Sequence, residues 1–286
     1  MAKHKLNWNE EKYNRFIKEG KGQGIGKEYK PWIDIQSFPS AGRVSRVFSW
    51  KTGRIHHLLS DLQTRYFYML EWEDTVIDIR EHYPLLDVEG TIKEKADLRF
   101  DLFTDKESGF PYVICTNFLI TLKNNDGSNL YIARAVKMAS DLEKKRTLER
   151  LEIERRYWTT GKDIEWCLVT QKEISKLNIF SKNIEWVHTS LYSYQERGFS
   201  QEDMLYMSGV LIERLEDNTH SIRKITSDFD KEFNYESGTG LFVFKFLIAS
   251  KQIDIDMMNP VDINAGSPEI RIRQQKKGEG AKIICL

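Results

Sequence analysis

The sequence predicts an α/β fold in which helices cover a mixed sheet. Three observations carry this prediction: an antiparallel hairpin over residues 112–137, a long charged helix directly after it, and a short buried strand at 164–170. With a strand before the hairpin, this order of elements describes a small sheet packed against helices. The chain of 286 residues, 40% hydrophobic and 12% aromatic, is long enough to bury one large core or two smaller ones.

The first regular element that we expect is a helix over residues 58–72, in the pattern HLLSDLQTRYFYMLEW. Its apolar residues recur at helical spacing, and Ser60 stands where an N-cap is expected. Gln63 follows Ser60 at the spacing of a capping box, in which Gln63 would return a hydrogen bond to the backbone. The run TVIDIREHYPLL then predicts a strand that leads into a turn.

The hairpin bears most on function. Its runs YVICTNFLITL and LYIARAVK are rich in β-branched and aromatic residues, and the connector Lys-Asn-Asn-Asp-Gly-Ser-Asn is dense in turn formers. Side chains on a strand repeat with period two, so Ala135 and Lys137 share a face. Folding the hairpin about its Asp-Gly turn brings Asn117 close to both. We therefore expect these three side chains to converge on one patch.

Such a patch has the frame of a metal-dependent nuclease site. A phosphodiester nuclease needs Asp or Glu ligands for Mg²⁺, and a lysine that orients the attacking water and offsets charge in the transition state. Of the three residues, only Lys137 has that chemistry. The alternative is that Asn117, Ala135 and Lys137 are ordinary sheet residues.

The helix after the hairpin is predicted from ASDLEKKRTLERLEIERRYW, and the buried strand from IEWCLVT. The composition changes near residues 171–182, which we interpret as a domain boundary. Residues 1–172 then form one domain, with a basic arm at its start, and residues 173–258 form a second.

The second domain is predicted to be helical and similar to a winged helix. One helix starts at residue 201, another spans about 219–233, and a third is GLFVFKFLIAS, before the alternating strand QIDIDM. Residues 259–286 form a basic tail with an apolar end, which can order on a partner protein. The residues expected to bind the partner are Arg271, Arg273, Lys276, Lys277, Ile283 and Ile284.

The overall charge does not indicate a nucleic-acid partner, because the charges of 43 basic and 43 acidic residues cancel. Residues 1–60 differ, with twelve Lys and Arg against five Asp and Glu. We interpret this arm as a surface that contacts DNA phosphates; a solvated basic segment without a partner is the alternative. The residues expected to bind DNA are Lys21, Lys27, Arg43, Arg46, Lys51 and Arg54.

A glycine cluster lies at residues 20–26 and invites comparison with a phosphate loop. It lacks the required glycine spacing, has no Ser or Thr after Lys27, and follows no convincing strand. We interpret it as a flexible basic loop against the DNA backbone, with a plain linker as the alternative.

Cys115, Cys167 and Cys285 are odd in number and far apart, so neither a disulfide framework nor a zinc cluster is expected. The sequence has no run of about 18 apolar residues and no signal-type segment. These features predict a protein of the reducing cytoplasm that does not enter a membrane.

Four segments together resemble one family: GKGQGIGKEYKPW, KTGRIHHLLSDL, LEWEDTVIDIREHYPL and TLERLEIERRYW. They are similar to TnsA, the endonuclease subunit of the heteromeric transposase of bacterial Tn-seven-like elements. The match runs from about residue 18 to residue 182 and continues more weakly beyond. Several long motifs in the right order are more specific than any single short one.

The resemblance implies a restriction-endonuclease-like, or PD-(D/E)xK, domain that cuts double-stranded DNA at the 5′ ends of the transposon. It also implies two protein partners. A sister DDE-type transposase would cut and join the 3′ ends, and an AAA+ ATPase regulator would control both. The family resemblance points to the C-terminal end of the chain as the ATPase contact.

In the family, a helix Glu, a strand Asp, a Gln or Glu and a Lys form the site, with Mg²⁺ as cofactor. These positions carry over to Gln63, Asn117, Ala135 and Lys137, of which the first three depart from the pattern. An amide oxygen is a far poorer Mg²⁺ ligand than a carboxylate. The resemblance therefore implies impaired metal ligands at Gln63, Asn117 and the Val136 carbonyl.

Two functions follow from this departure. The chain is a nuclease subunit whose chemistry is silenced, or it is an adaptor that links transposase and ATPase on DNA and never cuts. Because the changes at Gln63 and Asn117 are isosteric, they favour deliberate inactivation; natural decay of the site is the alternative, and Ala135 stands at the least uniform position. A DNA-binding regulator ranks last, because the segment 219–232 lacks a basic recognition face.

Overall fold

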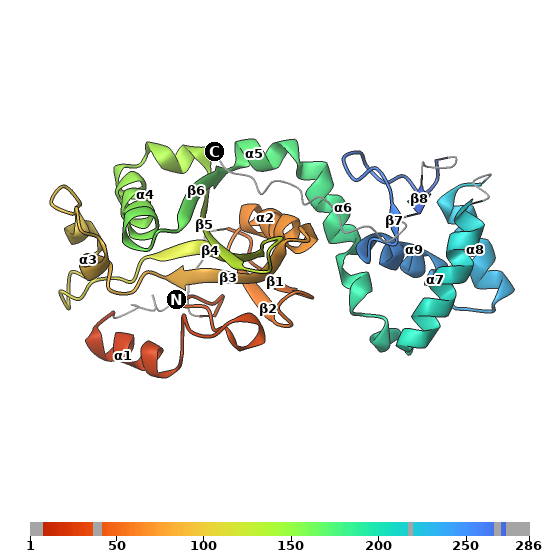
Figure 1. Ribbon diagram of the computed structural model, residues 1–286, viewed down its shortest axis with the longest axis horizontal. Helices are drawn as coiled ribbons and strands as arrows, with labels where there is room; N and C mark the ends of the chain where they lie inside the picture. Colours follow the sequence, from red (N-terminus) through yellow and green to blue (C-terminus); the bar gives the residue numbers. More distant parts are fainter. Residues whose placement is uncertain (1–7, 37–41, 217–219, 266–269, 273–286) are drawn as a thin grey trace, which may run out of the picture. The chain divides into compact units, whose positions relative to one another are not determined.

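A computed structural model describes residues 8–36, 42–216, 220–265 and 270–272. The chain divides into two compact units, one extending to Ser175 and one beginning at Lys176. Figure 1 labels the elements of both. The helices are α1 Glu10–Lys18, α2 Asp61–Trp72, α3 Val88–Thr91, α4 Lys145–Arg156, α5 Gln171–Lys176, α6 Asn178–His188, α7 Gln201–Glu216, α8 Ile222–Glu232 and α9 Thr239–Ala249. The strands are β1 Ser45–Phe48, β2 Ile55–Leu58, β3 Val76–Pro84, β4 Cys115–Lys123, β5 Asn129–Lys137, β6 Glu165–Thr170, β7 Ile253–Asp254 and β8 Arg271–Ile272.

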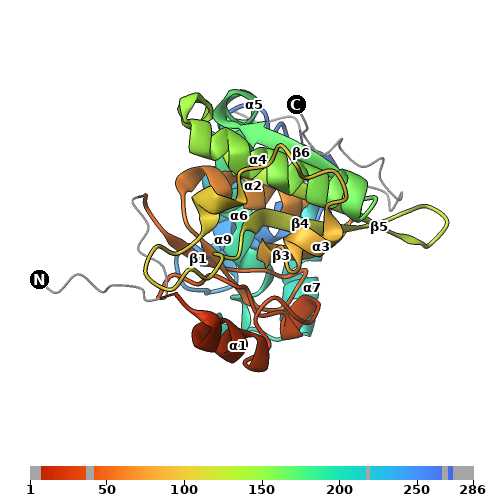
Figure 2. The same ribbon diagram turned by 90° about the vertical axis from the view of Figure 1, so that its left-hand side faces the viewer.

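The first unit is built on the mixed four-stranded sheet that the sequence predicts. Its strand order is β3-β4-β5-β6, antiparallel in the first two pairs and parallel in the last. The hairpin β4–β5 is confirmed, with Phe118 opposite Arg134 and Lys123 opposite Asn129. Its turn projects from the rest of the sheet in Figure 2.

Helices cover both faces of this sheet. On one face the ring of Tyr66 in α2 lies 5.8 Å from that of Phe118. The next residue, Leu119, packs into a buried cluster with Ile153 of α4 and with Trp158. Neighbouring strand residues point to opposite faces, so α2 and α4 lie on opposite sides. The predicted charged helix is shorter than expected, because a 3-10 turn precedes α4 and a π-helical segment follows it.

Two parts of the N-terminal region were not expected. Helix α1 contributes Phe16 to a second apolar cluster with Trp8 and Trp32. Strands β1 and β2 pair as an antiparallel hairpin. Because β2 takes up residues 55–58, the helix expected from residue 58 begins only at Asp61.

The glycine cluster is a defined loop packed on the sheet, so its interpretation as a flexible loop is wrong. Gly22, Gly24 and Gly26 all have positive φ, where residues with a side chain are strained. A Cβ on Gly22 would also lie 2.2 Å from Pro84 of β3. The glycines therefore serve local backbone geometry and close packing.

The second unit is helical, as expected. Helix α7 starts at Gln201 as predicted, α8 starts after its cap Ser221, and α9 covers the predicted apolar segment. Helix α6 was not predicted. Only two residues of QIDIDM form a strand, β7, and it pairs with β8 in the segment that we interpreted as a tail. Among the described residues, no helix combines the length and apolar character needed to cross a bilayer.

Candidate functional site

The candidate site begins where the β4–β5 ladder ends. The last paired residues at this end are Phe118 and Arg134. Beyond this pair, the contact between the two strands is made by a side chain: the Asn117 Oδ1 accepts a hydrogen bond from the Val136 N–H at 2.8 Å. Ala135 is fully buried. The structure therefore brings Asn117 beside the end of β5, as the hairpin prediction requires.

Gln63 has the structural role that its capping-box spacing indicates. The Ser60 hydroxyl oxygen accepts from the Gln63 N–H at 3.2 Å. The Gln63 Oε1 in turn accepts from the N–H of Leu59, one residue before the cap, at 2.9 Å. Two backbone donors at the start of α2, the N–H groups of Gln63 and Leu59, are thus satisfied by the side chains of Ser60 and Gln63.

These residues do not fit a Mg²⁺ site. The amide oxygens of Gln63 and Asn117 already accept backbone N–H groups, and neither carries the negative charge that Mg²⁺ prefers. The Val136 carbonyl alone cannot supply that charge. Within the described ranges, no group of three or more His, Cys, Asp and Glu side chains could hold a metal ion.

Lys137, the last residue of β5, lies beside α4. Burial lowers the pKa of Lys137 to about 8, and the Arg150 guanidinium acts in the same direction. Glu154 and Asp141 act in the opposite direction. The lysine of the predicted site therefore has charged neighbours that the sequence analysis did not single out.

Two of those neighbours form an ion pair on α4. Arg150 Nε donates to Glu154 Oε1 at 3.1 Å, and Arg150 Nη2 donates to the Cys115 carbonyl at 2.6 Å. Glu154 is fully buried, and its Oε2 accepts from the Thr116 hydroxyl at 3.3 Å. The i,i+4 spacing of Arg150 and Glu154 within TLERLEIERRYW indicates an ion pair, but it does not indicate that Glu154 is buried.

His82 of β3 is another group near Lys137. Its backbone has a positive φ of 48°, and its ring Nε2 lies 2.8 Å from the His57 carbonyl oxygen. Burial lowers the pKa of His82 to about 4, against the opposing effect of Glu81 and the His57 carbonyl. This histidine is therefore neutral at pH 7.

Acidification from pH 6.5 to pH 4 is expected to destabilise the first unit. The pKa of His82 is lower in the folded chain than the usual 6.5, so the unfolded chain binds more protons in this window. The free energy of unfolding therefore decreases as the pH is lowered. The difference corresponds to about 3 kcal/mol. Urea unfolding at several pH values measures how the free energy of unfolding changes with pH. This dependence should be weaker for His82→Asn, in which Asn tolerates the positive φ, than for His220→Asn. Equal slopes would contradict the assignment.

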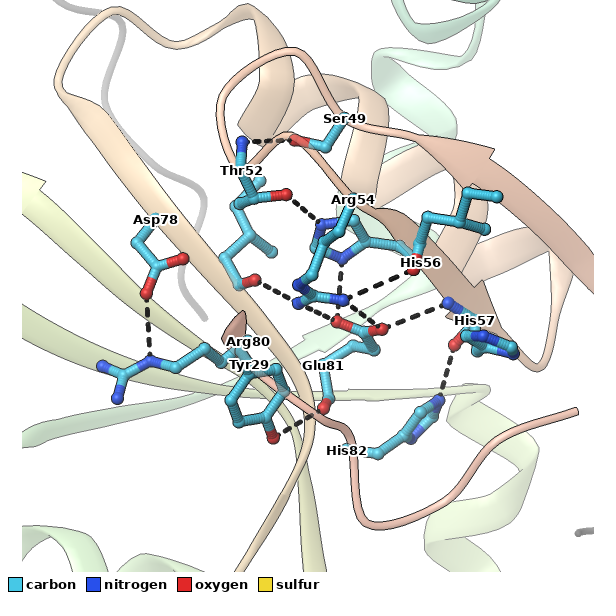
Figure 3. Close-up of polar contacts among 12 residues, drawn as sticks. Tyr29, Ser49, Thr52, Arg54, His56, His57, Asp78, Arg80, Glu81 and His82 are labelled. Atoms are coloured by element: carbon cyan, nitrogen blue, oxygen red, sulfur yellow. Dashed lines mark hydrogen bonds and ion pairs between the residues drawn. The ribbon is translucent and has the colours of Figure 1, made fainter. Parts of the chain in front are cut away.

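A buried charged cluster centres on Glu81 in β3 (Figure 3). Arg54 donates two hydrogen bonds to its carboxylate, at 2.8 and 2.5 Å, and the His57 N–H donates a third at 3.1 Å. His56 Nδ1 lies 2.8 Å from Glu81 Oε2. Burial alone would raise the pKa of Glu81, but His56 and Arg54 hold it well below its usual range.

The same cluster fixes the neighbouring segments. Arg54 Nε donates to the Gly26 carbonyl at 3.2 Å, and the Tyr29 hydroxyl donates to the Glu81 carbonyl at 3.0 Å. His56 Nε2 lies 2.9 Å from the Thr52 hydroxyl. The β1–β2 hairpin and the glycine loop are therefore both attached to β3 through residues around Glu81.

The residues expected to bind DNA divide into two groups. Lys27, Arg43 and Arg46 are exposed. The other three are engaged within the protein. Lys21 pairs with Asp34 at 3.0 Å, Lys51 donates to the carbonyls of Glu73 and Val76 at 2.8 and 2.7 Å, and Arg54 is buried against Glu81. The expectation that Arg54 is a surface contact is therefore corrected, because its guanidinium holds the fold together.

Most of the residues expected to bind a partner lie outside the described part of the chain. Arg271 is described and is exposed in β8. The others, Arg273, Lys276, Lys277, Ile283 and Ile284, fall in residues that the structure does not describe.

Comparison with known proteins agrees with the resemblance. The model for the TnsA-like endonuclease N terminal matches residues 73–171, and that for the TnsA endonuclease C terminal matches residues 173–257. The Escherichia coli "Transposon Tn7 transposition protein TnsA" is 39% identical over 251 residues, which cover 87% of each chain. On these matches, the chain belongs to the TnsA family of endonucleases.

Proposed function

We propose that this chain is the TnsA-type subunit of a Tn7-like transposase, and that it binds transposon-end DNA without cutting it. One observation carries the proposal: the amide oxygens of Gln63 and Asn117 accept backbone N–H groups where the family resemblance places carboxylates. Mg²⁺ belongs to the reaction that the resemblance implies, but the residues of this site do not fit it. The 5′-end cleavage expected of a TnsA subunit is therefore silent in this version.

The proposal extends to the folds of the two units. A restriction-endonuclease-like first unit is supported by its mixed sheet, with α2 before β3 and with Asn117 and Lys137 at one end of the β4–β5 hairpin. A winged-helix-like second unit is supported by three consecutive helices followed by the short β7–β8 pair. We keep residues 1–172, 173–258 and 259–286 as the proposed functional division.

The proposed partners are transposon-end DNA, a sister DDE-type transposase and an AAA+ ATPase regulator, in the bacterial cytoplasm. The similarity to a Tn7 transposition protein supports this setting. The C-terminal region, with Arg271 and the basic residues beyond it, is the proposed ATPase contact. An adaptor that never cuts is the second candidate, and the amides at positions 63 and 117 favour it if the gene encodes them.

The unaltered chain is expected to bind a transposon-end duplex without nicking it, even with the sister transposase, the ATPase and Mg²⁺ present. Gel-shift and end-labelled cleavage assays on the same samples check both halves of this statement. A 5′-end nick that requires Mg²⁺ and this chain would refute the silent site. Absence of DNA binding would refute the DNA-bound role.

The exposed cations of the arm should set the salt dependence of this binding. Arg43→Gln with Arg46→Gln removes two candidate phosphate contacts, so the slope of log affinity against log salt should fall by about two. Lys93→Gln with Lys106→Gln removes two other exposed charges and serves as the matched control. Equal slopes for the two double variants would place the DNA elsewhere.

A further inference from the structure

Two cations, Lys137 at the end of β5 and Arg150 of α4, lie near one buried carboxylate, that of Glu154. Within the described part of the chain, the Lys137 ammonium has no hydrogen-bond or ion-pair partner. Its neighbour Arg150 pairs with Glu154 but keeps one third of its side chain exposed. Asp141, which also acts on Lys137, is itself paired with Lys144, at 2.7 Å. The local balance of charge is therefore positive.

The positive charge continues along α4. Arg150 lines an open hollow of about 470 Å³, together with Arg146 and Lys144. Arg146 and Arg150 are one helical turn apart, which is about 6 Å along the helix. The Arg146 guanidinium also lies over the ring of Phe103, at 5.5 Å, which holds it beside the hollow. Lys144, Arg146 and Arg150 therefore line one hollow beside α4, and Arg150 is also a charged neighbour of Lys137.

The amides at positions 63 and 117 decide what such a site can bind. Carboxylates there would add two negative charges and would repel a phosphodiester unless a metal ion stood between them. With amides, no added charge offsets the two cations. A phosphodiester supplies one negative charge and free acceptor oxygens, which suit ammonium and guanidinium donors.

We infer that Lys137 and Arg150 form a binding site for a DNA backbone phosphate that works without a metal ion. The inference rests on the proposed function, because it assigns the silent nuclease site a positive role in holding DNA. Loss of the carboxylates then converts a site that cuts DNA with a metal ion into one that binds a DNA phosphate without it. We call this phosphate-binding pair, Lys137 and Arg150, the clamp.

The first test measures the affinity for a short duplex DNA in the presence of EDTA. Lys137→Met should weaken binding about ten-fold and lower the salt slope by about one, because one charged contact is lost. Lys137→Arg should retain most of the affinity. Removal of Lys137 leaves no hydrogen-bond partner unsatisfied within the described residues, and Lys93→Met is the matched control. If Lys137→Met binds like Lys93→Met, the site is refuted.

The second test removes the Arg150 guanidinium and the Glu154 carboxylate together. Arg150→Gln with Glu154→Gln leaves the net charge unchanged but removes the guanidinium, so its affinity in EDTA should also fall. Unchanged affinity would remove Arg150 from the site. Melting temperatures of all variants establish that they are folded.

A third comparison separates this inference from the proposed function. Gln63→Glu with Asn117→Asp should bind DNA more weakly than the unaltered chain in EDTA and regain affinity when Mg²⁺ is added. Equal affinity of the two proteins in EDTA would overturn the clamp. If the unaltered chain cuts DNA with Mg²⁺, the proposed function fails, while the EDTA measurements still decide whether Lys137 and Arg150 hold phosphate.

Discussion

Gln63→Glu together with Asn117→Asp is expected to give this chain Mg²⁺-dependent cleavage at the 5′ ends of the transposon. Two recovered carboxylates would supply the charge that holds Mg²⁺ beside the scissile phosphate, while Lys137 is already in place to position water. We expect an increase in cleavage rate on the order of 10³-fold or more. End-labelled transposon DNA, with the sister transposase present, measures it.

The fold should tolerate both changes. The Gln63 and Asn117 side chains each accept a backbone N–H, at 2.9 and 2.8 Å, and a carboxylate oxygen of the same shape can accept the same bond. Neither substitution alters side-chain volume appreciably. A loss of activity through unfolding is therefore not expected.

The controls follow from the cooperative nature of a metal site. Either change alone should recover little cleavage, because the ligands act as a unit. Lys137→Ala added to the double variant should abolish cleavage again. If the double variant binds transposon ends and stays inert with all partners and Mg²⁺ supplied, then Ala135 limits the site or the chain is an adaptor. Adding Ala135→Gln distinguishes these two outcomes.

Arg54→Met should cost about 3–5 kcal/mol in the free energy of unfolding, the largest loss that we expect from a single substitution here. It removes both short hydrogen bonds to the Glu81 carboxylate and leaves that group buried with only the His56 and His57 contacts. It also removes the bond from Arg54 to the Gly26 carbonyl. Denaturant unfolding followed by tryptophan fluorescence measures the change.

Two comparisons test the explanation. Arg99→Met removes an exposed ion pair with Asp101, so its effect should be small by comparison. Arg54→Met combined with Glu81→Leu removes both charges and should be less destabilising than Arg54→Met alone. A loss under about 1 kcal/mol for Arg54→Met would contradict the role assigned to the Glu81 cluster.

The sequence predicted the elements that follow local rules. The β4–β5 hairpin has alternating strands and an Asp-Gly turn, and α2 has Ser60 and Gln63 at capping distance, so both were found close to their observed positions. The same local rules placed Asn117 beside the end of β5, where the structure has it. Short-range geometry was sufficient in these cases.

Elements held by distant partners could not be predicted. The β1–β2 hairpin is short, and its attachment depends on Arg54 reaching Glu81, 27 residues away. From sequence, a basic residue in a basic arm resembles a DNA contact, and nothing in the arm indicates burial. Arg150 and Glu154 were hidden for the same reason, since a charged helix face gives no sign of which charges turn inward.

The backbone bonds made by Gln63 and Asn117 bear on how this site lost its carboxylates. Once selection for cutting is lost, selection for stability still favours side chains that accept hydrogen bonds from the N–H groups of Leu59 and Val136. A single-step replacement that preserves shape and acceptor is the amide in both cases. Natural mutation under selection for stability alone can therefore produce Gln and Asn at these positions. Isosteric replacement thus does not distinguish deliberate inactivation from natural decay of the site. Natural relatives of this chain that have also lost cleavage would then carry amides, rather than arbitrary residues, at positions 63 and 117.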